Sequence, residues 1–189
     1  MARSKRDDIM EAALILFAER GYDGTTVPMI AEKAKVGAGT IYRYFENKES
    51  LVNALFQDNV TKFSEMLRNC IDENSDDIRH QFHLLFQQMV QFAKRNEFSL
   101  QFIDSHACNH YLDEKSNQIF DEFLGFLHSF AVKGSDEGVL CSLHPDAIIA
   151  IVYGAFSRLY KLIRLGMIEE SEQLIQQVED CCWNAIRIY

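Results

Sequence analysis

Few features of this 189-residue sequence fit a β-rich, secreted or membrane-spanning protein. Only two prolines occur, Pro28 and Pro145, and both stand where a helix would begin. No stretch alternates polar and β-branched residues as a strand would, so the fold is predicted to be all-α. The longest apolar runs are too short to cross a membrane, and residues 1–20 do not resemble a signal peptide. A cytoplasmic protein without a membrane partner is therefore expected.

Several chemical motifs are also missing. The five cysteines include no CxxC pair, so we expect free thiols in a reducing compartment and no zinc site of that kind. There is no GxSxG nucleophile motif and no glycine-rich phosphate loop, and the acidic residues are scattered over helix surfaces. The sequence therefore predicts neither an enzyme nor a bound cofactor.

The net charge of −9 is unevenly distributed along the chain. Residues 1–48 contain eight Lys and Arg against seven Asp and Glu, whereas residues 49–189 contain eleven against twenty-one. Arg3, Lys5 and Arg6 make the N-terminus basic. Because DNA would repel an acidic body, it could approach only the first segment. We therefore predict a DNA-binding domain over residues 1–48 and a helical domain over residues 49–189.

The first helix of the N-terminal segment has a recognisable start and end. The hydroxyl of Ser4 and the carboxylate of Asp7 fit a capping box, in which each side chain accepts a hydrogen bond from the other residue's backbone. An apolar stripe follows, and Gly21 is expected to end the helix as a left-handed cap.

Two short helices joined by a tight turn follow, which is the pattern of a helix-turn-helix. Thr25 or Thr26 would cap the second helix of the domain. The turn is expected at residues 35–37, with positive φ at Gly37, and the third helix at residues 38–45.

The outer face of the third helix carries residue types that suit DNA. Ala38 and Gly39 are small enough for a close backbone approach, and three hydroxyl side chains between residues 40 and 44 suit phosphates. Arg43 could donate two parallel hydrogen bonds to guanine, and Lys48 begins the next helix beside that helix's positive end. The predicted DNA-binding residues are Arg3, Lys5, Thr25, Thr26, Ala38, Gly39, Thr40, Tyr42, Arg43, Tyr44 and Lys48.

This block resembles the DNA-binding domain of the tetracycline-repressor-like (TetR) family of bacterial transcriptional regulators. The resemblance rests on residues 9–22, 25–27, 30–31 and 39–51, about the first quarter of the chain. It implies a homodimeric repressor that releases its operator when a small ligand binds. It also implies phosphate or base contacts at the matching Thr26, Ala38, Gly39, Thr40, Tyr42, Tyr44 and Lys48.

The rest of the chain predicts further helices, about nine in all. They are expected near residues 48–72, 77–95, 99–110, 114–132, 145–166 and beyond, with the clearest loop at residues 133–138. The first half of the helix from Pro145 is apolar on nearly every side, which predicts burial all round. Two long apolar helices over residues 145–189 would suit an isologous dimer interface, as the resemblance also implies. A two-fold axis would require a palindromic operator on double-stranded DNA.

A ligand pocket is predicted between the helices of the body, where bundles commonly bind small molecules. The resemblance implies a pocket between the fourth and eighth helices. An aromatic lining favours an apolar or amphipathic effector. The candidate lining residues are Phe63, Phe86, Met89, Phe102, His106, Phe123, Tyr153 and Phe156.

His106 and His110 support an alternative function. On a helix over residues 99–110 they would lie one turn apart on one face, a spacing that suits two metal ligands, with Cys108 pointing away. The alternative is a metal- or redox-sensing regulator of the same fold that uses these histidines or the cysteines. Two histidines alone do not define a metal site, so no metal ligand is assigned.

Overall fold

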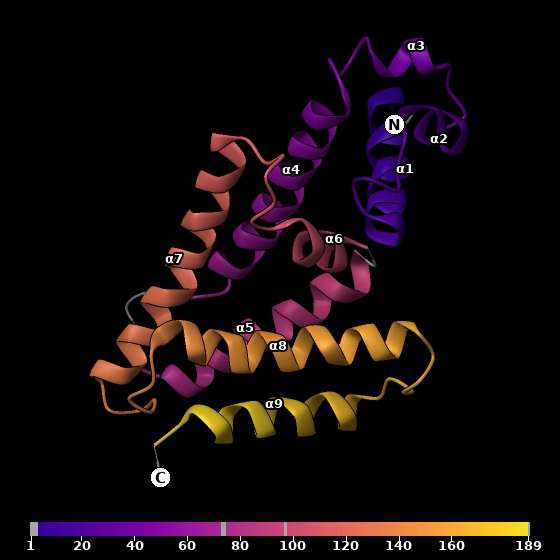
Figure 1. The fold of residues 1–189 in the computed structure, drawn as a ribbon. Coiled ribbons are helices and arrows are strands. Elements are labelled where there is room, and N and C mark those ends of the chain that lie inside the picture. The colour runs from indigo at the N-terminus through magenta and orange to yellow at the C-terminus, as the bar shows by residue number, and fades with distance from the viewer. Residues whose placement is uncertain (1–3, 73–74, 97, 189) are drawn as a thin grey trace. The chain divides into compact units, whose positions relative to one another are not determined.

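The structure is a computed structural model that describes residues 4–72, 75–96 and 98–188. Over these ranges the chain forms nine α-helices, and the only strand-like pairing is an isolated bridge between Leu140 and Arg187, which confirms the all-α prediction. The helices, labelled in Figure 1, are α1 (Lys5–Arg20), α2 (Val27–Lys33), α3 (Ala38–Ile41), α4 (Lys48–Arg68), α5 (Ile78–Arg95), α6 (Ser99–His106), α7 (Glu114–Asp136), α8 (Pro145–Arg164) and α9 (Glu172–Ile186).

The helices belong to two compact units. The first comprises the described residues of Met1–Phe63 and Asn96–Asp121, and the second comprises those of Ser64–Arg95 and Glu122–Tyr189. Helix α6 therefore shares a unit with α1, and α4 runs from one unit into the other. The two units differ from the predicted division at residue 48, because α6 is separated from the helix-turn-helix in sequence but packs on α1.

Helix α1 begins as predicted but ends differently. The Asp7 backbone N–H donates to Ser4 Oγ at 3.2 Å and the Ser4 N–H donates to Asp7 Oδ2 at 3.1 Å, which confirms the capping box. Gly21 has φ 69° and ψ −179°, so it is not the left-handed helical cap that was predicted. This combination of angles is essentially restricted to glycine, and it turns the chain into the α1–α2 connection.

The turn between α2 and α3 uses a different residue from the one predicted. The positive φ falls on Lys35, at 55°, whereas Gly37 has φ −70° and ψ 144° as the residue preceding α3. Regular helix also ends at Ile41 rather than at residue 45. The chain continues in tighter turns, since the N–H of Arg43 donates to Thr40 O at 3.3 Å.

Aromatic side chains form the core of the first unit. Phe17 of α1, Phe56 of α4 and Phe102 of α6 are fully buried. The ring of Phe102 lies 6.2 Å from that of Phe17 and 6.4 Å from that of Phe56, centre to centre. These contacts join the helix-turn-helix to α6 within one core.

Helix α7 is longer than predicted, because the expected loop at residues 133–138 is helical as far as Asp136. Gly134 is buried inside the helix, and a Cβ there would lie 2.6 Å from Leu140 Cδ1 and 3.3 Å from Ile78 Cγ2. The glycine thus allows Leu140 and Ile78 to pack directly against the helix backbone. The chain turns only at Gly138, which has φ 71°.

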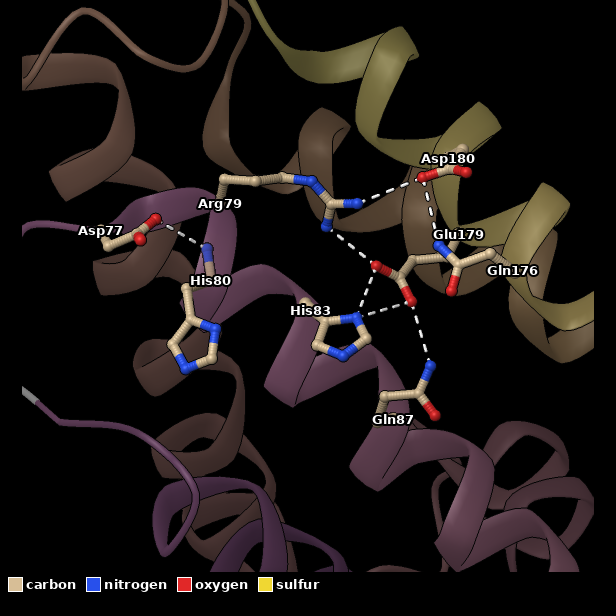
Figure 2. Close-up of polar contacts among 8 residues, drawn as sticks. All are labelled: Asp77, Arg79, His80, His83, Gln87, Gln176, Glu179 and Asp180. Carbon is tan, nitrogen blue, oxygen red and sulfur yellow. Dashed lines mark hydrogen bonds and ion pairs between the residues drawn. The ribbon is translucent and has the colours of Figure 1, made fainter.

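Helix α9 is attached to α5 through a buried carboxylate (Figure 2). Glu179 has no exposed surface, and its oxygens accept hydrogen bonds from Arg79 Nη1 at 2.8 Å, His83 Nδ1 at 2.9 Å and Gln87 Nε2 at 3.0 Å. Arg79 also pairs with Asp180 at 3.2 Å. The prediction that the acidic residues lie scattered over helix surfaces is therefore wrong at Glu179.

Helices α8 and α9 run side by side (Figure 1). Ile148 and Phe156 of α8 are buried, but Ile151 is 38% exposed and Ala150, Gly154 and Ala155 are exposed as well. The prediction that this helix is buried all round is therefore wrong for a single chain. Its face of small and apolar residues remains in contact with solvent.

Candidate nucleic-acid interface

The helix-turn-helix is built on buried anchors from each of its helices. Ile30 of α2, Ile41 of α3 and Phe45 after α3 are buried, and α1 packs against α2. The hydroxyl of Thr26 accepts a hydrogen bond from the N–H of Met29 at 3.5 Å, so Thr26 caps α2. The sequence had left open whether Thr25 or Thr26 would be the cap.

The opposite side of residues 38–44, which comprise α3 and the turns after it, is open to solvent. Ala38 and Gly39 are exposed, and a Cβ at Gly39 would meet nothing within 4 Å. Arg43 is exposed, and Tyr42 and Tyr44 have 56% and 47% of their surface exposed. This face therefore presents hydroxyls, a guanidinium group and a smooth backbone edge together, which suits phosphates and base edges.

Thr25 does not fit its predicted contact with DNA. Its side chain is fully buried, and Oγ1 lies 2.8 Å from Gly21 O and 3.1 Å from Leu16 O. The hydroxyl proton is thus used inside the domain, where it ties the start of α2 to the end of α1. Thr26, the next residue, is exposed and keeps its predicted position at the surface.

Lys48 is half-buried and is already engaged within the domain. Its Nζ donates to Tyr22 O at 2.9 Å and to Thr25 O at 3.1 Å, and it lies 3.9 Å from the centre of the Tyr22 ring. An ammonium group has three N–H donors, so one remains for a phosphate. The structure thus adds an internal role for Lys48 that the sequence pattern did not reveal.

The basic N-terminus is described only in part. Arg3 lies outside the described residues, and Lys5 is exposed at the start of α1. The guanidinium carbon of Arg6 lies 5.5 Å from the centre of the Phe45 ring. Arg6 therefore places a positive charge beside the end of the α3 segment, although the sequence pattern assigned it only to a basic arm.

The predicted ligand-pocket residues are mostly core residues, and they belong to both units. Phe63, Phe102 and His106 lie in the first unit; Phe86, Met89, Phe123, Tyr153 and Phe156 lie in the second. All are buried except Tyr153, which is half-buried. The ring centres of Phe86 and Phe156 are 5.8 Å apart. A role for any of these residues in ligand binding remains a prediction.

A surface groove of about 530 Å³ lies along α7 in the second unit. It shares no residue with the predicted pocket set. Its lining consists of His128, Ser129, Val132, Lys133, Asp136 and Glu137.

The predicted pairing of His106 with His110 on one helix face is wrong. Helix α6 ends at His106, and Cys108 has φ 61°, so His110 lies beyond the helix. His106 is buried among Phe17, Phe102 and Tyr111, and its Nδ1 lies 2.9 Å from Phe102 O. Nowhere in the described ranges do three or more His, Cys, Asp or Glu side chains gather as a metal site would require.

The cysteines are free thiols with different environments. Cys182 is buried, and burial, aided by Cys181 and Glu179, raises its pKa to about 11. Burial also raises the pKa of Cys70. Because the thiolate is the reactive form, neither Cys70 nor Cys182 suits redox sensing, whereas Cys108 and Cys181 are exposed.

Comparison with known proteins covers almost the whole chain. A family model described as "Bacterial regulatory proteins, tetR family" matches residues 9–55, and one described as "Tetracyclin repressor-like, C-terminal domain" matches residues 56–188. The "Fatty acid metabolism regulator protein" of Bacillus subtilis (strain 168) is 29% identical over 138 residues, which are 72% of this chain and 71% of that protein.

Two further proteins illustrate the range of similarity. The "Biofilm operon icaADBC HTH-type negative transcriptional regulator IcaR" of Staphylococcus epidermidis is 26% identical over 127 residues, 64% of this chain and 68% of that one. The structure of "ketosteroid transcriptional regulator KstR2" of Mycobacterium tuberculosis superposes with a TM-score of 0.80 at 20% identity, covering 100% of this chain and 98% of that one. No helix in the described part of the chain has both the length and the apolar character needed to cross a membrane.

Proposed function

The chain belongs to the tetR family of bacterial regulatory proteins, and on this premise we propose that it is a sequence-specific transcriptional repressor. In this proposal it binds a palindromic operator on double-stranded DNA as a homodimer. A small apolar or amphipathic ligand releases it.

The exposed side of residues 38–44, which comprise α3 and the turns after it, is the observation that carries DNA binding. Tyr42 and Tyr44 expose about half of their surfaces, whereas Ile41 and Phe45, their neighbours, are buried. Exposed aromatic residues on a packed scaffold are typical of a recognition surface. Helix α3 would enter the major groove, where Arg43 can read guanine and the hydroxyls can bind phosphates.

The solvent-facing side of α8 supports the dimer. Ile151 and its exposed neighbours Ala150, Gly154 and Ala155 form a smooth surface on which a second copy could pack closely. Two copies related by a two-fold axis would present two α3 helices to half-sites one helical turn, roughly 34–36 Å, or a multiple of it apart.

The nature of the ligand is suggested by the relatives. One is named as a regulator of fatty acid metabolism and another as a ketosteroid regulator, and the predicted pocket residues of this chain are mainly apolar. We therefore expect a ligand with an acyl chain or a steroid-like ring system. It would release DNA only if it binds the free form of the dimer more tightly than the DNA-bound form.

Selection of bound duplexes from a random pool, at stated salt, tests DNA binding. A palindrome should be enriched by the native protein. Arg43→Ala should relax the preference at one position of each half-site and cost about 1–3 kcal/mol, whereas Arg20→Ala at the end of α1 should leave the motif unchanged. An unaltered motif with Arg43→Ala would remove the base-reading role from this residue.

The dimer and the ligand have separate tests. Ile151→Asp should shift the protein towards monomer in analytical ultracentrifugation, whereas Leu124→Asp, at a similarly exposed leucine of α7, should not. Long-chain acyl thioesters and steroids should raise the melting temperature and lower operator binding in fluorescence anisotropy. A panel without any stabilising compound would argue against an apolar effector.

A further inference from the structure

Two connections in the first unit meet through stacked tyrosines. Tyr22 lies in the α1–α2 connection and Tyr111 in the α6–α7 connection. Their ring centres are 4.1 Å apart with an angle of 18° between the planes. Lys48 Nζ lies 3.9 Å from the centre of the Tyr22 ring. Two groups this close to one ring centre cannot share a face, so Tyr22 is held between the ammonium group and Tyr111.

The backbone strengthens this arrangement on the side of the helix-turn-helix. Lys48 donates to the carbonyls of Tyr22 and Thr25, so the position of its ammonium group depends on where the α1–α2 connection lies. A cation above an aromatic face is attracted by the ring's negative face, which adds to these hydrogen bonds. The one N–H that remains is the part of Lys48 available to a phosphate.

Tyr111 is held from the other side by α4. Asn53 is buried, and its Nδ2 donates to Tyr111 O at 2.8 Å. Its Oδ1 accepts the N–H of Asp113 at 2.8 Å and the hydroxyl of Ser116 at 2.7 Å. A single amide of α4 therefore holds the end of the α6–α7 connection that leads into α7.

Both phenols are neutral over the physiological pH range. Burial, with contributions from Asp23 and Tyr22, raises the pKa of Tyr111 to about 12. Burial, with contributions from Glu49 and Asp23, also raises the pKa of Tyr22. Ionisation of a phenol therefore does not disturb the stack in this pH range.

We propose that Tyr111 is a positioning residue for DNA binding, which acts through Tyr22 to hold the ammonium group of Lys48 in place for a backbone phosphate. Tyr111 itself does not touch DNA. A movement of the α6–α7 connection would separate the two rings, so that Tyr22 and the ammonium group of Lys48 would be positioned only by the α1–α2 connection. The inference rests on the proposed function, because it assigns Lys48 to a phosphate contact.

A double-mutant cycle on the full-length protein tests this inference. Kd for the selected duplex is measured over a range of salt concentrations for Tyr111→Leu, Lys48→Ala and the double variant. Tyr111→Leu should weaken binding about 3- to 10-fold for all sequences alike. It should also reduce the slope of log Kd against log salt by about 0.9 for each phosphate that the variant no longer neutralises. In the Lys48→Ala background the same change should have almost no further effect.

Two control variants separate positioning from general packing. Tyr111→Phe keeps the stacked ring and should bind within about twofold of the native protein. Phe120→Leu removes an aromatic ring that packs on Phe56 in the same unit, and it should leave the salt slope unchanged. If Tyr111→Leu does not fold, Tyr22→Leu interrupts the same stack from the other side and should show the same lack of additivity with Lys48→Ala.

The possible outcomes are distinct. The inference would be overturned if Tyr111→Leu reduced affinity equally in the native and in the Lys48→Ala background. The same holds for Tyr22→Leu if it is used in place of Tyr111→Leu. A folded Tyr111→Leu variant with native affinity and salt slope would also overturn it. In both cases the native protein would still bind its palindrome and the proposed function would stand. A native protein that selects no DNA would overturn the proposed function and this inference with it.

Discussion

Glu179→Gln is expected to destabilise the protein by about 2 kcal/mol at neutral pH. The native carboxylate is fully buried and accepts hydrogen bonds from Arg79, His83 and Gln87 (Figure 2). A glutamine side chain has the same shape but only one acceptor oxygen and no charge. At least one of the three donors would therefore lose its partner, and hydrogen bonds to charged groups contribute about 1.5–3 kcal/mol each.

The exposure of the partners limits this cost. Breaking a fully buried ion pair costs about 3–5 kcal/mol, because an uncompensated charge stays in the interior. Arg79 is 36% exposed and also pairs with Asp180, so water and that carboxylate can take over part of the interaction. For a domain of this size, 2 kcal/mol corresponds to a decrease in melting temperature of roughly 4–8 °C.

The effect should depend on pH in a defined direction. Burial by itself would raise the pKa of Glu179, but the hydrogen bonds from Arg79, His83 and Gln87 outweigh it and hold the pKa below the ordinary value of 4.5. A carboxylate whose pKa is lower in the folded state than in the unfolded state stabilises the folded protein at pH values above its unfolded-state pKa. This contribution is lost as pH falls through its folded-state pKa. The stability difference between native and Glu179→Gln proteins should therefore decrease as pH falls below 4.5 and disappear below the folded-state pKa of Glu179.

Urea unfolding followed by circular dichroism at pH 7 and at pH 4 measures the difference, at one protein concentration because dimerisation adds to stability. Asp180→Asn is the matched control: it removes a neighbouring carboxylate of α9 that also pairs with Arg79 but is 52% exposed. Its effect should stay below about 1 kcal/mol. Equal stability of Glu179→Gln and native protein at pH 7 would refute the reasoning.

Three further predictions concern single side chains. Gly134→Ala should lower the free energy of unfolding by about 1–3 kcal/mol in urea titrations, because the added Cβ would overlap Leu140. The control, Gly125→Ala, adds a Cβ in open space on the same helix and should be neutral or stabilising. Thr25→Val should cost about 1 kcal/mol in the same assay, because it removes the hydroxyl that bonds Gly21 O. In native protein a thiol reagent followed by mass spectrometry should modify exposed Cys108 well before Cys182; modification of both at equal rates would contradict the assigned burial.

The helix-turn-helix illustrates how far sequence reasoning extends. Caps such as the Ser4–Asp7 box and the helix start at Pro145 depend on residues within one turn, and the structure confirms both. The choice between Thr25 and Thr26 was left open because both have the same chemistry. Only the packing of α2 on α1 made Thr25 the buried residue and Thr26 the cap.

Two of the errors concern where a helix ends. Residues 133–138 had the composition of a loop, but α7 continues to Asp136, and Leu140 and Ile78 lie close to Gly134 within it. His106 and His110 had the spacing of a helix face, but the chain leaves the helix at His106. Periodicity describes what a helix would present if it continued, and it contains no signal for where tertiary packing ends it.

The sequence by itself determined the all-helical fold, the helix-turn-helix and the separation of charge, because caps, apolar periodicity and composition act over a few residues. Tertiary structure alone decided which polar groups became internal. Glu179 meets Arg79 across 100 positions of the chain, and Lys48 meets the carbonyl of Tyr22 across 26. A charged residue looks the same in the sequence whether water or a buried partner surrounds its charge, so only the packing of the helices shows which charged residues are internal.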